Sequence, residues 1–101
     1  MAYYAEQAAM TGTAIPLSTI FGAGVPYARY VRVQGATANA AAVSVGNSDL
    51  TTTTNIGAST GPVASVTDPI VIGPFDSPSI SLASIYVVGA NTEIAYLSVV
   101  A

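Results

Sequence analysis

Short apolar segments with a two-residue alternation, each ending within a few positions at Gly, Pro or Asn, constrain the fold of this chain most strongly. The alternation is clearest in residues 27–34, where Val31 and Val33 share one face of an extended strand and polar or tyrosine side chains share the other. No stretch after residue 12 has the apolar spacing of an ordinary helix. The pattern predicts an all-β fold, either an antiparallel β-sandwich or a jelly-roll-like, partly closed barrel, formed by one domain over residues 13–101.

The expected strands follow one another at short intervals. They are residues 13–17, 27–34, 41–45, 51–55, 63–66, 70–72, 80–82, 85–88 and 93–100. Pro16 places the first of them at a sheet edge, because proline lacks the N–H that a central strand donates. Residues 57–62 contain two glycines and end in proline, so we expect a loop there. Residues 89–92 join two strong strand patterns, which predicts a hairpin between 85–88 and 94–100.

Residues 1–12 differ from the rest of the chain and are predicted to form an N-terminal arm. Their Ala, Glu, Gln and Met residues suit a helical turn, but the segment is shorter than an isolated helix that is stable in water. The segment has no partner in the strand pattern, and it carries the adjacent aromatic residues Tyr3 and Tyr4. We expect the arm to cross onto a neighbouring subunit with these two tyrosines as its anchors. The alternative is a terminal segment that docks on nothing.

The amino-acid composition argues against most enzyme mechanisms. The chain has no His, no Cys and no Lys, so a Ser or Thr nucleophile has no evident general base and no thiolate or imidazole can bind a metal. The catalytic alternative is a pair of carboxylates of the glycosidase type, but each carboxylate is expected in a turn, at a strand start or in the arm. The carboxylates are Glu6, Asp49, Asp68, Asp76 and Glu93. We predict no enzyme activity, no metal site and no cofactor.

The net charge limits the classes of molecule that can be partners of this protein. A net charge of −3 argues against nucleic acid, because phosphate binding needs a basic surface and only Arg29 and Arg32 are cationic. On one strand these two arginines face opposite sides, and each is expected to pair with a carboxylate or to contact another subunit. No run approaches the roughly 18 apolar residues of a membrane helix. The first residues lack a signal-peptide pattern, so synthesis and folding in the cytoplasm are expected.

Low charge together with an apolar share of 51% has two interpretations. Ser, Thr, Asn and Gln can solvate the surface in place of charged residues. Alternatively, neighbouring subunits cover much of the surface, so that charge is not needed for solubility. The two interpretations are compatible.

Several segments resemble a family of small virion proteins of tailed phages. They are Val-Arg-Val-Gln at 31–34, Asn-Ala-Ala-Ala-Val at 39–43, Ser-Val-Gly at 44–46, the threonine run at 50–54, Ile-Tyr-Val-Val at 85–88, Gly-Ala-Asn-Thr at 89–92 and the strand 94–100. The resemblance covers about two-thirds of the chain and implies a β-sandwich of the kind found in capsid decoration proteins and head fibres.

The resemblance further implies a structural function. It is that of a decoration (cement) protein on the outer capsid surface of the virion, made in the host cytoplasm, with the major capsid protein as partner. It also implies a homo-oligomer, with a trimer favoured, because decoration proteins often sit on local three-fold axes. The subunit or capsid interface is then expected to include Tyr3, Tyr4, Arg29 and Arg32. The alternative from another class is a receptor- or carbohydrate-binding module on a fibre or tail.

Overall fold

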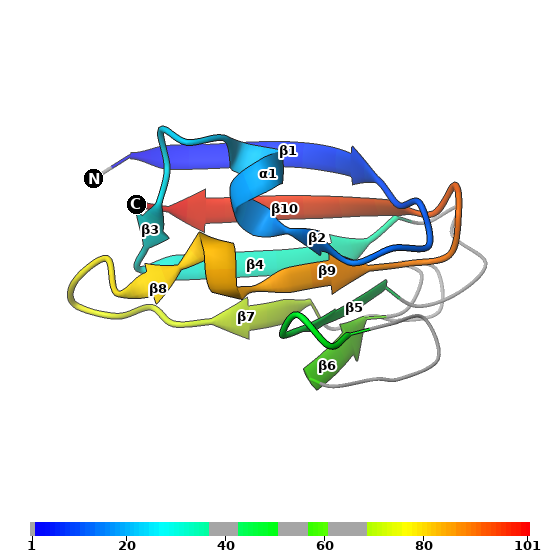
Figure 1. Ribbon diagram of the computed structural model, residues 1–101. Helices are drawn as coiled ribbons and strands as arrows, with labels where there is room; N and C mark the ends of the chain where they lie inside the picture. Colours follow the sequence, from blue (N-terminus) through cyan, green and yellow to red (C-terminus); the bar gives the residue numbers. More distant parts are fainter. Residues whose placement is uncertain (1, 37–42, 51–56, 61–68) are drawn as a thin grey trace.

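The computed structural model describes residues 2–36, 43–50, 57–60 and 69–101, and in this part of the chain the fold is all-β (Figure 1). The long sheet has the strand order β1 (Tyr3–Ala9), β10 (Ile94–Val100), β4 (Tyr30–Gly35) and β7 (Ile70–Ile72). The short sheet has the order β2 (Ile15–Pro16), β9 (Tyr86–Val88), β5 (Val43–Gly46) and β6 (Gly57–Thr60). A further pair joins β3 (Tyr27–Ala28) to β8 (Ile80–Ser81).

All these strand pairs are antiparallel, and neither four-stranded sheet closes on itself. The all-β class predicted from the sequence is confirmed. The expected strands at 51–55 and 63–66 lie outside the described residues.

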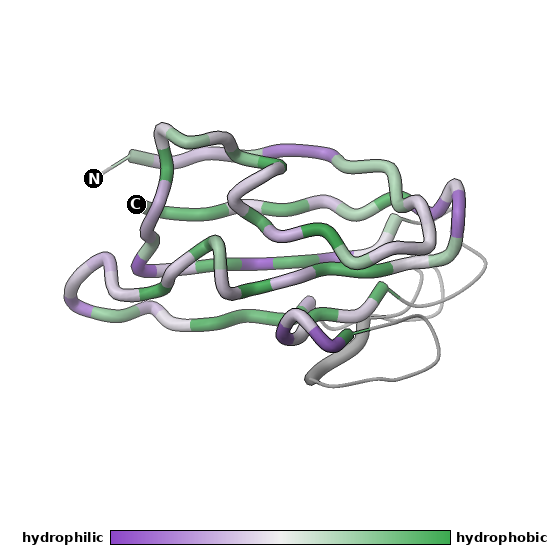
Figure 2. The backbone as a smooth tube through the Cα atoms, in the orientation of Figure 1, coloured by the Kyte–Doolittle hydropathy of each residue, from purple (hydrophilic) through white to green (hydrophobic). Residues whose placement is uncertain are grey.

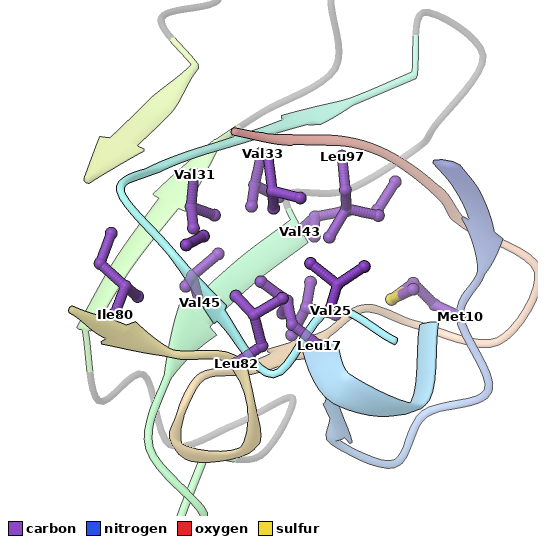
Figure 3. Packing of buried hydrophobic residues seen from close by; sticks show 14 residues of the cluster. Met10, Leu17, Val25, Val31, Val33, Val43, Val45, Ile80, Leu82 and Leu97 are labelled. Atoms are coloured by element: carbon purple, nitrogen blue, oxygen red, sulfur yellow. The ribbon is translucent and has the colours of Figure 1, made fainter. Parts of the chain in front are cut away.

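One hydrophobic core fills the space between the sheets, as Figure 3 shows. The long sheet contributes alternate residues of β4 and β10, among them Val33 and Leu97, and the short sheet contributes alternate residues of β5, such as Val43. Burial of such side chains provides most of the stabilising free energy of a small domain. The buried cluster consists of Met10, Leu17, Val25, Ala28, Val31, Val33, Val43, Val45, Ile80, Leu82, Val87, Ala95, Leu97 and Val99.

Two short helical turns lie beside the strands. Helix α1 (Leu17–Phe21) begins directly after Pro16, and its Leu17 is fully buried. The helix ends at Gly22, whose φ of 83° is accessible to glycine and whose N–H donates to the Ser18 carbonyl (2.9 Å). The second turn, η2, is a 3-10 helix over Leu82–Ser84. The expected strand at 13–17 is therefore shortened to two residues by α1.

The predicted hairpin of 85–88 with 94–100 is wrong. Strand β9 pairs with β2 and β5 in the short sheet, whereas β10 pairs with β1 and β4 in the long sheet. The connection between them crosses from one sheet to the other and is held to the end of β1. The Gly89 carbonyl accepts from the Gly12 N–H (3.1 Å), and the Thr92 N–H donates to the Met10 carbonyl (3.0 Å). These long-range bonds replace the local ladder that the turn residues suggested.

The segment predicted as an unpaired arm is strand β1. It pairs along its whole length with β10, from Tyr3 opposite Val100 to Ala9 opposite Ile94, and it is the outermost strand of the long sheet. The expectation of a helical turn without a strand partner is wrong because a long-range ladder outweighs the local helix propensity of Ala, Glu and Gln.

One smaller expectation on the short sheet also fails. Residues 57–60, expected in a loop, form β6, which pairs with β5. The turn after β5 follows Gly46, the last residue of that strand. In this turn the Asn47 Oδ1 accepts from the Asp49 N–H (2.9 Å).

Candidate functional site: the outer face of the long sheet

The surface of the long sheet that points away from the core is the candidate site. Side chains alternate between the two faces of a strand, so the residues between the buried ones of β4 and β10 point outward. The register adds the residues of β1 and β7 that lie opposite them. We call this surface the outer face. It consists of Tyr3, Ala5, Gln7 and Ala9 of β1, Ile94, Tyr96, Ser98 and Val100 of β10, Tyr30, Arg32 and Gln34 of β4, and Val71 of β7.

Three tyrosines gather on the outer face. Tyr3 of β1 is opposite Val100 of β10, which is in turn opposite Tyr30 of β4. Tyr96 lies on β10 between glutamines of β1 and β4. Directly opposed side chains have Cβ atoms about 4.5–5.5 Å apart, so these residues form continuous rows across the sheet.

No layer of the described chain covers the outer face. Tyr96 is 45% exposed although its strand has neighbours on both sides, and a second layer packed on this face would have buried it. Val71 is 46% exposed and Tyr3 is 70% exposed on the same surface. In Figure 2, β10 is mostly neutral to hydrophobic, whereas the hydrophilic colour lies in several turns and in parts of β1 and β4. A monomeric protein seldom leaves large side chains grouped in this way without a function for them.

Arg32 is the only charged residue of the outer face as the structure describes it. It lies between the tyrosine rows, opposite Ser98, and its Nη2 donates to the neutral Gln34 Oε1 (3.0 Å). Glu6 is on the neighbouring strand β1 but belongs to the opposite face, because it lies in register with the buried Leu97. The outer face is therefore cationic in a protein whose net charge is −3. It fits a partner surface that presents a carboxylate among apolar groups.

The structure separates the four residues predicted for the interface. Tyr3 and Arg32 share the outer face, but Tyr4 is in register with Val99 and therefore points to the inner side of β1, where it is 38% exposed. Two adjacent residues of a strand cannot anchor to the same surface. The pairing of Tyr3 with Tyr4 as joint anchors depended on an arm without strand geometry, and it does not hold in β1.

Arg29 ties a loop to the sheet. It interrupts the strand between β3 and β4, and its N–H donates to the Val100 carbonyl (2.7 Å). Its own carbonyl accepts from the Phe75 N–H (2.8 Å), and its Nη1 donates to the Asp76 carbonyl (3.1 Å). Arg29 and Arg32 have different hydrogen-bond partners, and within the described residues neither forms an ion pair.

No cluster of metal-binding type is present in residues 2–36, 43–50, 57–60 and 69–101. No three His, Cys, Asp or Glu side chains in these residues come together as metal ligands. Asp49 and Asp76 are exposed, and the largely buried carboxylate Glu93 lies in the connection before β10. In the same residues, no helix has the length and apolar character needed to cross a membrane.

Sequence reasoning missed Tyr96 and Val71 as members of the site. The signal for Tyr96 was present, because it alternates with the apolar residues Ala95 and Leu97 in a strand that was predicted. What the sequence lacked was the strand order, which sets Tyr96 beside β1 and β4 and so gathers the tyrosines.

Comparison of the chain with known protein families, with curated proteins and with solved structures yields no match.

Proposed function

We propose that this protein is a structural virion protein, a capsid decoration (cement) protein that binds the outer surface of a phage head and stabilises it. The observation that carries the proposal is the uncovered outer face, which holds three tyrosines and a single arginine. Tyr and Arg are the residues most enriched among those that dominate the energy of protein interfaces. The sequence resemblance of residues 31–54 and 85–100 to small virion proteins supports the same function.

The form of the surface favours a protein partner over a small molecule. Small-molecule sites are concave and enclose most of their ligand, whereas the outer face is one side of an open sheet. On it, Tyr3 and Tyr96 offer large contact areas that lose little conformational entropy on docking. Arg32 then pairs with a carboxylate of the major capsid protein. A modest affinity per copy is sufficient, because many copies attached to one shell act together.

Copy number is the first test. A cement protein occurs in hundreds of copies per particle, whereas a tail-tip or fibre component occurs in few. The proteins of purified virions are separated by gel electrophoresis. The band intensities of this protein and of the major capsid protein are then compared. A ratio near one supports capsid decoration. A ratio below one hundredth, or absence of the protein from particles, contradicts it.

Binding of variants tests the outer face itself. Tyr96→Ser and Arg32→Glu should each weaken binding to capsids that lack the protein by about tenfold or more, as expected for residues central to an interface. Tyr27→Ser is the matched control, because Tyr27 is 54% exposed but lies on β3, outside the outer face. If the control weakens binding as much as Tyr96→Ser, the outer face is not the docking surface.

A receptor- or carbohydrate-binding module on a fibre or tail is the second candidate. The exposed tyrosines favour it to the extent that sugar rings stack on aromatic side chains. The same variants distinguish the two candidates when glycan arrays or host-cell binding replace capsids as the ligand. Low copy number together with loss of glycan or cell binding in Tyr96→Ser would favour this candidate over the cement protein.

A further inference from the structure

The unpaired backbone edge of β1 is a second surface, which borders the outer face. In an antiparallel pair only every second residue exchanges backbone hydrogen bonds with its partner. The Ala101 N–H donates to the Ala2 carbonyl (2.8 Å) and the Met10 N–H donates to the Glu93 carbonyl (2.7 Å), so the even-numbered residues bond to the β10 side. The odd-numbered residues of β1 direct their N–H and C=O groups to the opposite edge, which we call the free edge. They are Tyr3, Ala5, Gln7 and Ala9.

The free edge is long and unprotected. No hydrogen bond joins its backbone groups to any other residue that the structure describes. Strand β1 spans 7 residues, contains neither Pro nor Gly, and has Glu6 as its one charged residue. A row of unpaired N–H and C=O groups of this length is a template for another strand.

The other sheet edges in the described residues are short and carry residues that oppose pairing. β2 has 2 residues and includes Pro16. β7 has 3 residues and lies between Pro69 and Pro74. β6 has 4 residues and begins with Gly57. Short edges offer few hydrogen bonds, and proline removes a donor, which are the usual means by which proteins prevent edge pairing. Only β1 lacks them.

We propose that β1 pairs, antiparallel and about a two-fold axis, with β1 of a second copy of this chain, so that the two long sheets join into one. The same edge then serves both molecules, as a two-fold contact requires. The inference rests on the backbone of β1 and does not depend on the proposed function.

Two features of β1 favour a second copy as its occupant. Tyrosines are exposed on both sides of the strand, Tyr3 on the outer face and Tyr4 on the inner side, so an added strand meets aromatic side chains on either face. Strand β1 also has only one charged residue, so it is complementary to a partner strand that is almost uncharged as well. A highly charged peptide would leave its charges without partners there.

The position of the two-fold axis follows from hydrogen bonding and charge. Odd-numbered residues must meet odd-numbered residues, which allows an axis at Ala5, Glu6 or Gln7. An axis at Glu6 places two carboxylates directly opposite each other, which is unfavourable. An axis at Gln7 leaves Tyr3 and Tyr4 beyond the paired residues of the partner strand. An axis at Ala5 places Tyr4 opposite Glu6 and Tyr3 opposite Gln7 of the second copy, and it is the register we propose.

Cysteine cross-linking tests the register directly, because the chain contains no cysteine. With the axis at Ala5, the two Ala5 Cα atoms lie about 5.5 Å apart. Disulfides form across about 4.4–6.8 Å, so Ala5→Cys should give a covalent dimer under mild oxidation. Gln7→Cys is the matched control, because it lies on the same edge and the same face but is offset by two residues from the axis.

The outcomes of this experiment are distinct. Ala5→Cys should cross-link at least tenfold faster than Gln7→Cys, as read from non-reducing gels over time. Equal rates, or faster cross-linking of Gln7→Cys, overturn the proposed register.

Solution size tests the pairing itself. The wild-type chain should sediment as a dimer at micromolar to millimolar concentration, and Ala5→Pro, which removes an outward N–H, should sediment as a monomer with an unchanged circular dichroism spectrum. A wild-type monomer at millimolar concentration, or a trimer, overturns the proposal. If Ala5→Pro does not fold, the cross-linking rates decide. Tyr96→Ser should remain a dimer while losing capsid binding, so failure of the edge and failure of the outer face are separate results.

Discussion

Leu97 and Tyr96 are neighbours on β10 that point to opposite faces of the long sheet, and truncating each to alanine compares those faces. Leu97 is 1% exposed and lies opposite the fully buried Val33 on the adjacent strand. Removal of its side chain leaves a cavity that buried neighbours cannot fill. Tyr96, at 45% exposure, loses only cross-strand contacts. The two residues are adjacent on one strand, and that strand is paired on both sides.

The two substitutions should lower the free energy of unfolding by clearly different amounts. Leu97→Ala should lower the free energy of unfolding by about 3 kcal/mol, within the range of about 2–5 kcal/mol for buried leucines. For a domain of this size that corresponds to a fall in Tm of roughly 12–24 °C. Tyr96→Ala should cost at most about 1 kcal/mol, the value of one cross-strand pair. A domain of 101 residues has about 5–15 kcal/mol of stability in total, so both variants should still fold.

Urea and thermal unfolding followed by circular dichroism measure both values under the same conditions. The wild-type spectrum at low temperature is the control for retained β structure. Equal losses in the two variants would mean that the outer face is covered. A larger loss for Tyr96→Ala would mean that the strand is shifted by one residue, which exchanges the two faces. Either result would refute the description of the outer face.

Three glycine substitutions, one of them a control, test backbone geometry by the same unfolding assay. Gly73→Ala should lower the free energy of unfolding by about 1–3 kcal/mol, because its φ of 93° is strained for alanine and the new Cβ would collide with the Arg29 carbonyl. Gly24→Ala is the control. Gly24 has open space around it, so this change should alter the free energy of unfolding by less than about 0.5 kcal/mol. Gly89→Ala should also lower the free energy of unfolding, because its new Cβ would lie 2.7 Å from the Met10 Cγ. This loss should be smaller when Met10 is also changed to alanine. If the effects of Gly89→Ala and Met10→Ala are strictly additive in the double variant, the contact is contradicted.

Local pattern was sufficient for the strands whose two faces differ. The alternation of Val31 and Val33 with polar neighbours predicted β4 and the side to which Arg32 points, and both are found. The same kind of alternation predicted β10, and a short apolar run between turn residues predicted β7. Alternation predicts such strands because every second side chain of a half-buried strand must point to the core. This requirement is visible in consecutive residues of the sequence.

Pairing between distant segments decided everything else about the candidate site. Residues 3–9 have no alternation that predicts a strand. They form a strand because each of them pairs with a residue of β10. The turn residues at 89–92 suggested a hairpin, yet the connection bonds to Gly12 and Met10 and passes between sheets. The gathering of Tyr3, Tyr30 and Tyr96 on one surface follows from strand order and register. Such contacts join residues far apart in the chain, and their free energy depends on the whole assembled core, so no local stretch of sequence encodes them.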